Sequence, residues 1–166
     1  IYRGPLAELL RTLADSEDFQ KLVKLQTLHS HDGTREELVL KFFAYLDIGN
    51  KYNGDVTGIL NTFMKENAHS FDITKGRALF EATVGEILNI TNGPLLRKGY
   101  SVTPLNQLEA VLVGAGTIIR GNNKIIAPNN DWLNDKELLK YSTKGTNTRS
   151  AFEGRNKRAI ELLSGK

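Results

Sequence analysis

Apolar residues recur every three or four positions over most of the first 120 residues of the chain. This spacing is typical of helices that bury one face. Leu6, Leu9 and Leu13, for example, follow Pro5, a residue suited to the first position of a helix. The apolar–polar alternation of a half-buried strand is nearly absent. The sequence therefore predicts an all-α fold, a single helical bundle of about six to eight helices.

Polar residues mark the expected helix starts. Asp55 and Asp72 each precede an apolar pattern, and a carboxylate there can accept hydrogen bonds from the first backbone N–H groups. Thr34, with Glu37 three residues later, matches a capping box. The helix that follows Thr34 is apolar around much of its circumference, so we expect it to be the central helix. The side chains expected in the core are Phe42, Phe43, Phe63, Phe80, Leu108 and Leu112.

Two glycines lie within the predicted helix over residues 105–119. Gly114 and Gly116 carry no side chain, so a neighbouring helix can approach closely at these positions. The same glycines could begin a dinucleotide-binding loop, but the third glycine is missing and no strand precedes them. We therefore interpret them as helix-packing residues.

After residue 121 the helical pattern loosens into turns rich in asparagine. A short helix is expected over residues 132–141, and a last helix over residues 149–163. We expect a helical core over residues 1–121. The remaining residues, 122–166, form a C-terminal extension that packs on the same domain and ends in a basic helix.

Length and composition exclude several classes of protein. A chain of 166 residues favours one domain. No apolar run approaches the roughly 18 residues that a membrane helix requires. Because the chain has no cysteine, disulfides, thiol chemistry and cysteine-bound zinc are excluded. The chain opens without Met and without a signal-peptide pattern, so we expect a cytoplasmic fragment of a longer protein.

Positive charge is concentrated near the C-terminal end. Residues 140–158 contain six basic side chains and one acidic side chain, whereas residues 1–139 contain 15 basic and 17 acidic ones. DNA phosphates attract such cations, together with hydroxyl or amide donors and the N–H groups of a helix start. The residues predicted to contact phosphate are Lys144, Thr146, Asn147, Arg149, Arg155 and Arg158. The alternative is a solvated helix face without a partner.

His29, His31 and Asp32 form the only metal-like cluster of the sequence. Two imidazoles and a carboxylate could share one divalent ion. The only other histidine is His69, and no motif supplies a fourth ligand, so we interpret the cluster as a solvated capping loop and predict no metal site. Phosphate-loop, nucleophile-elbow and zinc-protease motifs are absent as well, and no catalytic residue is assigned.

Three ordered stretches resemble a known family. They are residues 1–5 (IYRGP), residues 35–44 (REELVLKFFA) with 52–54 (YNG) and 59–64 (ILNTFM), and residues 103–111 (TPLNQLEAV). A Ser/Thr/Asn-rich loop and a terminal basic helix follow them. This order is similar to the helical half of the bacterial proteins typified by the GmrS part of GmrSD restriction systems. The likeness spans about residues 1–120 and 140–164.

In that family a ParB- or sulfiredoxin-like N-terminal domain is associated with nucleotide hydrolysis through an Asp-Gly-Gln-Arg-type motif. A nuclease domain of the HNH type follows the helical part or belongs to a partner. Neither signature occurs in this chain. The resemblance therefore implies a fragment with no cofactor of its own, whose parent is an NTP- and Mg²⁺-dependent endonuclease in restriction or phage defence. Its implied partners are the DNA phosphate backbone and the NTPase-like and nuclease domains.

Three functions remain open. The first is a noncatalytic helical domain that positions DNA or couples the missing NTPase domain to a nuclease. The second is a protein–protein interaction scaffold whose basic segment is merely solvated. The third, a stand-alone enzyme, has no catalytic constellation in its favour. Salt-dependent DNA binding separates the first function from the second.

Overall fold

The computed structural model describes residues 2–29 and 31–166, so Ile1 of the first family-like stretch and Ser30 of the histidine loop lie outside the described residues. The described residues form helices and no strand, which confirms the predicted all-α bundle. The helices are α1 (Pro5–Ala14), α2 (Glu17–Leu22), α3 (Thr34–Leu46), α4 (Val56–Asn67), α5 (Ile73–Thr91), α6 (Leu105–Arg120), α7 (Lys136–Thr143) and α8 (Arg149–Leu163). Within these same residues, no helix has the length and apolar character needed to cross a membrane.

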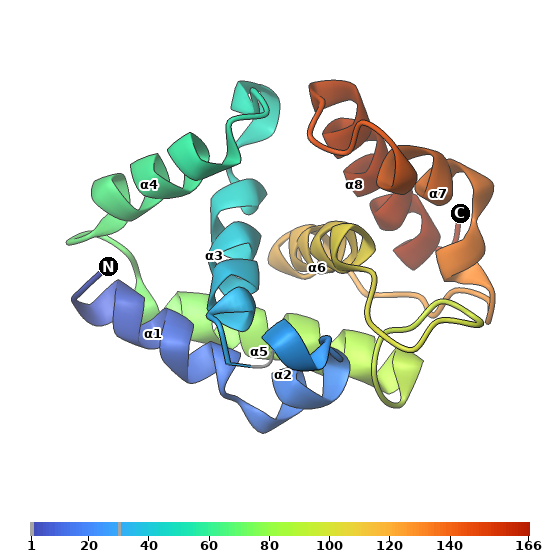
Figure 1. Ribbon diagram of the computed structural model, residues 1–166, viewed down its shortest axis with the longest axis horizontal. Helices are drawn as coiled ribbons and strands as arrows, with labels where there is room; N and C mark the ends of the chain where they lie inside the picture. The colour runs from blue at the N-terminus through green and yellow to red at the C-terminus, as the bar shows by residue number, and fades with distance from the viewer. Residues whose placement is uncertain (1, 30) are drawn as a thin grey trace.

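Helix α6 lies at the centre of the molecule, with α3 on one side, α8 on the other and α5 across its end (Figure 1). All residues from 107 to 116 of α6 are buried. Helix α3, the predicted central helix, contacts α1, α4 and α6 and exposes its first turn. The bundle is therefore built around α6, because this helix meets neighbours on more of its circumference.

The two glycines of α6 explain how neighbours approach it so closely. A Cβ atom added to Gly114 would lie 3.2 Å from the Ala159 Cβ of α8, and one added to Gly116 would lie 2.7 Å from the Phe42 ring of α3. The separation at Gly116 is too short for a side chain, and the one at Gly114 is tighter than ordinary van der Waals contact. The predicted role of both glycines in helix packing is confirmed.

Edge-to-face phenylalanine rings join α5 to α2 and α3. The centroid of the Phe80 ring lies 5.2 Å from that of Phe19 and 5.3 Å from that of Phe42. Aromatic pairs in this geometry are stabilised beyond the burial of their area. The expected core residues that are buried are Phe42, Phe43, Phe80, Leu108 and Leu112. Phe63 is only partly buried at the edge of this cluster, because α4 packs against one helix, α3.

Two of the predicted helix caps are confirmed. The side chains of Asp55 and Asp72 each accept a hydrogen bond of 3.0 Å from the backbone N–H three residues later. The predicted capping box is wrong. Thr34 is the first residue of α3 and follows Gly33, which has a φ of +84°. The Asp32 carboxylate accepts from the Thr34 N–H at 3.1 Å, so the aspartate two residues earlier has replaced the threonine cap.

Helices α7 and α8 form a hairpin that packs against α6 (Figure 1). The predicted short helix over 132–141 is divided at Asp135 into a 3₁₀ turn and α7, because the Asp135 carboxylate caps the new helix by accepting from the Leu138 N–H at 3.0 Å. Gly154 lets α8 lie against the Tyr141 ring of α7: an added Cβ would lie 2.6 Å from that ring. The segment that carries the candidate phosphate-contacting residues is thus fixed to the bundle.

Candidate nucleic-acid interface

The loop of residues 144–148, called the basic loop below, joins α7 to α8. Thr148 caps α8: its Oγ1 accepts a hydrogen bond of 3.1 Å from the Ala151 N–H. Helix α8 begins at Arg149, so backbone N–H groups of its first turn stand next to the basic loop. Such groups carry the partial positive charge of a helix start and favour an anion nearby.

Three of the predicted contact residues are exposed at this helix start: Lys144, Asn147 and Arg149. The Arg149 side chain pairs with a carboxylate: its Nε donates a hydrogen bond to Glu153 Oε1 at 2.9 Å. Both partners are about half exposed, so solvent screens the pair and it contributes little to stability. Arg149 can therefore leave Glu153 for a phosphate at small cost.

Arg155 was predicted to contact phosphate, and the structure places it elsewhere. Only 3% of the residue is exposed. Its Nη1 donates to the Thr146 carbonyl at 2.6 Å and to the Tyr141 carbonyl at 3.3 Å. Arg155 thus lies beneath the basic loop, and not on its surface. Thr146 is half-buried, with its carbonyl bonded to Arg155.

Arg158 is partly buried and is held within the α7–α8 hairpin, because it pairs with the acidic groups there. Its Nε and Nη2 each donate to the Asp135 carboxylate at 2.9 Å, a bidentate arrangement. Glu137 and Glu161 lie 3.7 and 3.6 Å from the same guanidinium. The hydrogen bonds with Arg158 lower the pKa of Asp135, and those with Asp135 raise the pKa of Arg158. Its charge therefore holds α8 to the start of α7.

Beneath the basic loop lies a group of buried charges that sequence reasoning missed. Glu109 of α6 is 9% exposed, and its Oε1 lies 3.5 Å from the Lys41 Nζ of α3. Burial raises the pKa of Glu109, while Lys41 and then Arg155 oppose that shift. Burial also lowers the pKa of Arg155, and the Glu109 carboxylate opposes this. Two buried charges, Glu109 and Arg155, and the partly buried Lys41 therefore join α6, α8 and α3; they are called the buried charge cluster below.

Aromatic rings cover this cluster. The Tyr52 ring stacks on the Phe152 ring of α8, with centroids 3.9 Å apart and an angle of 2° between the planes. The Tyr45 ring meets Phe152 edge-on at 4.9 Å. Burial raises the pKa of both tyrosines. The charges of Glu109 and Arg155 act on both tyrosines, and electrostatic interactions are stronger in such a buried, weakly polar surrounding than in water.

The turn after α3 approaches the basic loop at Gly54. Gly54 has a φ of +85°, and a Cβ added to it would lie 2.9 Å from the carbonyl oxygen of Asn147. The basic loop is therefore approached from the side by the turn after α3, in addition to Arg155 beneath it.

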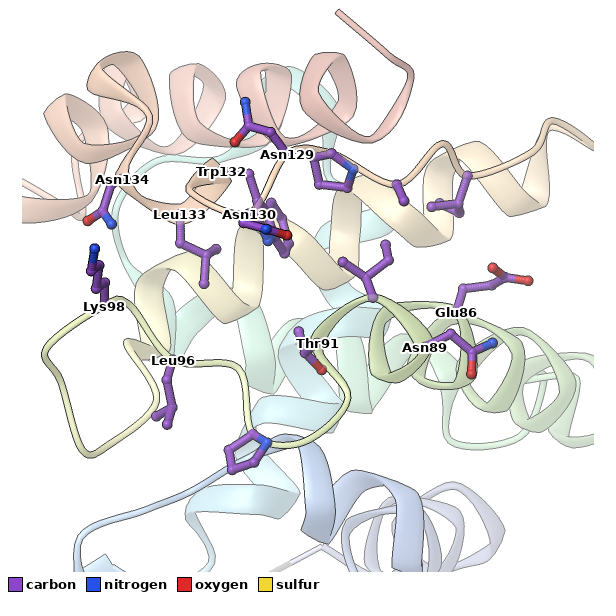
Figure 2. A pocket seen from close by; sticks show the side chains of 15 residues that line it. Glu86, Asn89, Thr91, Leu96, Lys98, Asn129, Asn130, Trp132, Leu133 and Asn134 are labelled. Atoms are coloured by element: carbon purple, nitrogen blue, oxygen red, sulfur yellow. The ribbon is translucent and has the colours of Figure 1, made fainter.

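A separate polar cleft of about 500 Å³ lies between α5, the loop that follows it and the segment of residues 125–134 (Figure 2). Glu86 and Asn89 line one end, and Lys98 and Asn134 line the other. The indole of Trp132, which borders the cleft, is almost fully buried. This lining contains no histidine, cysteine or serine. None of the residues predicted to contact phosphate or considered as metal ligands lines the cleft.

The histidine loop forms a hydrogen-bonded pair at the surface. His29 Nδ1 lies 2.6 Å from Asp32 Oδ2. Hydrogen bonds from Thr34 and then from His29 lower the pKa of Asp32 to about 2. Among the residues that the structure describes, no three histidine, aspartate or glutamate side chains are grouped as metal ligands.

No family model, no curated protein and no solved structure matches this chain. The GmrS-like origin therefore stays a prediction from the sequence.

Proposed function

We propose that this chain is a noncatalytic helical module of a restriction or phage-defence protein, which positions DNA or couples an NTP-hydrolysing domain to a nuclease. The observation that supports it is the basic loop. Lys144 and Asn147 are exposed there, beside the capped start of α8. A DNA phosphate would find a cation, an amide donor and helix N–H groups within one short segment.

The exposed cations of this region differ from those that the sequence suggested. With Arg155 buried and Arg158 bound to Asp135, they are Lys140, Lys144, Arg149 and Lys157. Four phosphate contacts give a log–log salt slope of about −3.6, and non-specific binding of this kind has dissociation constants of roughly 10⁻⁴ to 10⁻⁶ M at physiological salt. We therefore propose weak, sequence-independent attachment that depends on other domains for strength.

Affinity for a DNA duplex, measured over a series of salt concentrations, tests this proposal. Lys144→Ala is expected to flatten the slope by about 0.9. Lys65→Ala is the control, because Lys65 is equally exposed and lies in the last turn of α4, which runs away from α8 (Figure 1). Undetectable binding at low salt, or equal effects of both variants, would replace the DNA proposal with the scaffold.

The scaffold has one observation in its favour. Arg155 donates to the Thr146 carbonyl and Arg158 to the Asp135 carboxylate, so two of the cations predicted to contact phosphate are bound within the chain. In both proposals NTP and Mg²⁺ act in the parent protein. We expect the purified chain to hydrolyse neither nucleotides nor DNA. Magnesium-dependent turnover that a point mutation in this chain abolishes would overturn the noncatalytic assignment.

A further inference from the structure

We propose that Arg155 is a positioning residue, which holds the basic loop in the conformation that presents Lys144 and Asn147 to a phosphate. The role in phosphate binding rests on the proposed function, whereas the anchoring of the loop does not. Arg155 is the buried residue that sequence reasoning had placed on the surface, and its contacts assign it this different task.

The two carbonyls that Arg155 holds lie on either side of Lys144. Tyr141 belongs to the last part of α7, and Thr146 lies in the middle of the basic loop. One guanidinium nitrogen donates to both, at 3.3 and 2.6 Å. Lys144 therefore sits on a short length of backbone that is tied at both ends to a single buried side chain.

The buried charge cluster fixes Arg155 in turn. A guanidinium at this depth needs compensation for its lost hydration, which the Glu109 carboxylate and the two backbone carbonyls supply. The guanidinium carbon also lies 5.7 Å from the centre of the Phe152 ring, within the range of a cation–π interaction. Because arginine is planar and permanently charged, it can hold these partners without changing its protonation state.

A second contact holds the loop from the side. Gly54 leaves room for the Asn147 carbonyl, which an added Cβ would approach to 2.9 Å. The basic loop is therefore held from below by Arg155 of α8 and from the side by the turn after α3.

A positioning residue and a phosphate ligand leave different marks on binding. Loss of a ligand removes one released counterion, so the salt slope becomes shallower. If the anchor is lost, all phosphate-contacting cations stay in place, but DNA binding must then order a mobile loop. The affinity therefore falls while the salt slope stays unchanged. The slope therefore separates the two roles of basic residues in this region.

The first arm of the test measures the loop without DNA. Amide hydrogen exchange of residues 142–148 is compared in the wild type, Arg155→Gln, Arg155→Lys and Lys144→Ala. Tryptic cleavage after Lys144 is compared in the wild type and the two Arg155 variants, which retain this lysine. Both Arg155 variants are expected to speed exchange in this loop by roughly tenfold or more, whereas Lys144→Ala leaves exchange unchanged. If Arg155→Gln does not fold, Arg155→Lys retains the buried positive charge near Glu109 and gives the same comparison. Unchanged loop exchange in a folded Arg155 variant would overturn the proposal.

The second arm measures duplex affinity over salt. Arg155→Gln, which removes the charge, is expected to weaken binding several-fold at every salt concentration with the wild-type slope, in contrast to Lys144→Ala, whose slope flattens by about 0.9. A flattened slope for Arg155→Gln would show that Arg155 is a phosphate ligand. If the wild type binds no DNA, the proposed function fails, and the exchange arm still decides whether Arg155 anchors the loop.

Discussion

Different chemistry holds together two regions of the molecule: helices α1 to α5, and the junction of α6 with α8. Around α5 the contacts are edge-to-face phenylalanines and aliphatic side chains. At the α6–α8 junction, Glu109 and Arg155 are buried beside the partly buried Lys41, and the Tyr52 ring stacks on Phe152 nearby. Apolar packing tolerates small shifts, whereas buried charges require particular partners. The comparison indicates that the second region is built to hold one arrangement of the basic loop.

The largest effect is expected in the phenylalanine cluster. Phe43 is 4% exposed, and its ring contacts those of Phe42 and Phe71 edge-on at 5.1 Å each. Phe43→Ala should lower the free energy of unfolding by about 3–5 kcal/mol, because it removes buried area and leaves a cavity. Urea unfolding followed by circular dichroism measures it. Phe63→Ala, at a partly buried position, is the control and should cost clearly less; a loss below about 1 kcal/mol for Phe43→Ala would remove Phe43 from the core.

The second prediction concerns the helix contacts of α6. Gly116→Ala would place a methyl group 2.7 Å from the Phe42 ring and should destabilise the fold by about 1–3 kcal/mol. Gly85→Ala is its control on α5, where an added Cβ meets nothing within 4 Å. That variant should stabilise the protein by about 0.5–1 kcal/mol, because alanine loses less backbone entropy in a helix. Equal effects of the two substitutions on urea unfolding would show that α6 does not meet α3 through Gly116.

The third prediction is a pH dependence of the α7–α8 hairpin. Hydrogen bonds from Arg158 lower the pKa of Asp135 in the folded state below its ordinary value of 3.8. The folded state therefore binds fewer protons than the unfolded state in this range, so Asp135 contributes stability above about pH 3.8 that is lost as the pH falls through the folded pKa. Asp135→Asn should cost about 1–2 kcal/mol at pH 7 through the loss of charged hydrogen bonds.

The gap in unfolding free energy between the wild type and Asp135→Asn should shrink as the pH is lowered below 3.8. The control is Asp131→Asn, at an exposed position just before the 3₁₀ turn, and it should show no such convergence. A gap that stays constant down to pH 2 would mean that the Asp135–Arg158 contact does not stabilise the hairpin.

Glu109 should give a pH dependence of stability opposite in sign to that of Asp135. Burial raises its pKa above the ordinary value of 4.5, so the folded state holds a proton that the unfolded state releases. Its contribution to stability is therefore greatest below the unfolded pKa and declines as the pH rises through the folded pKa. Glu109→Gln should lose this decline, which a pH series of urea midpoints measures. A parallel profile in wild type and variant would contradict the burial of an ionisable group at this position.

The helices could be predicted from the sequence because their signals are local. The carboxylates of Asp55 and Asp72 act on N–H groups three residues away, and apolar spacing of three or four residues identifies each buried face. Thr34 was misread because Asp32, only two residues earlier, competes for the same N–H group. This error moved the start of α3 by one residue, from the position after Thr34 to Thr34 itself.

The candidate site could be predicted only in part. The basic loop was found from its charge and its hydroxyl and amide side chains, and Lys144, Asn147 and Arg149 are exposed there. The partners of Arg155 and Arg158 are backbone carbonyls and Asp135, up to 23 residues away, and tertiary packing brings them together. One signal was available: Glu109 stands between apolar residues of the most apolar helix, where a carboxylate needs a buried cation.

Hydrogen exchange with and without a DNA duplex, at low salt, tests the central claim most directly, because it shows which residues DNA covers. The account predicts slower exchange at the basic loop and the first turn of α8, residues 144–152, and no change in α4. Wild-type protection that Lys144→Ala weakens would support phosphate contact at this loop. Protection confined to another surface, or none at a DNA concentration that saturates binding, would contradict it.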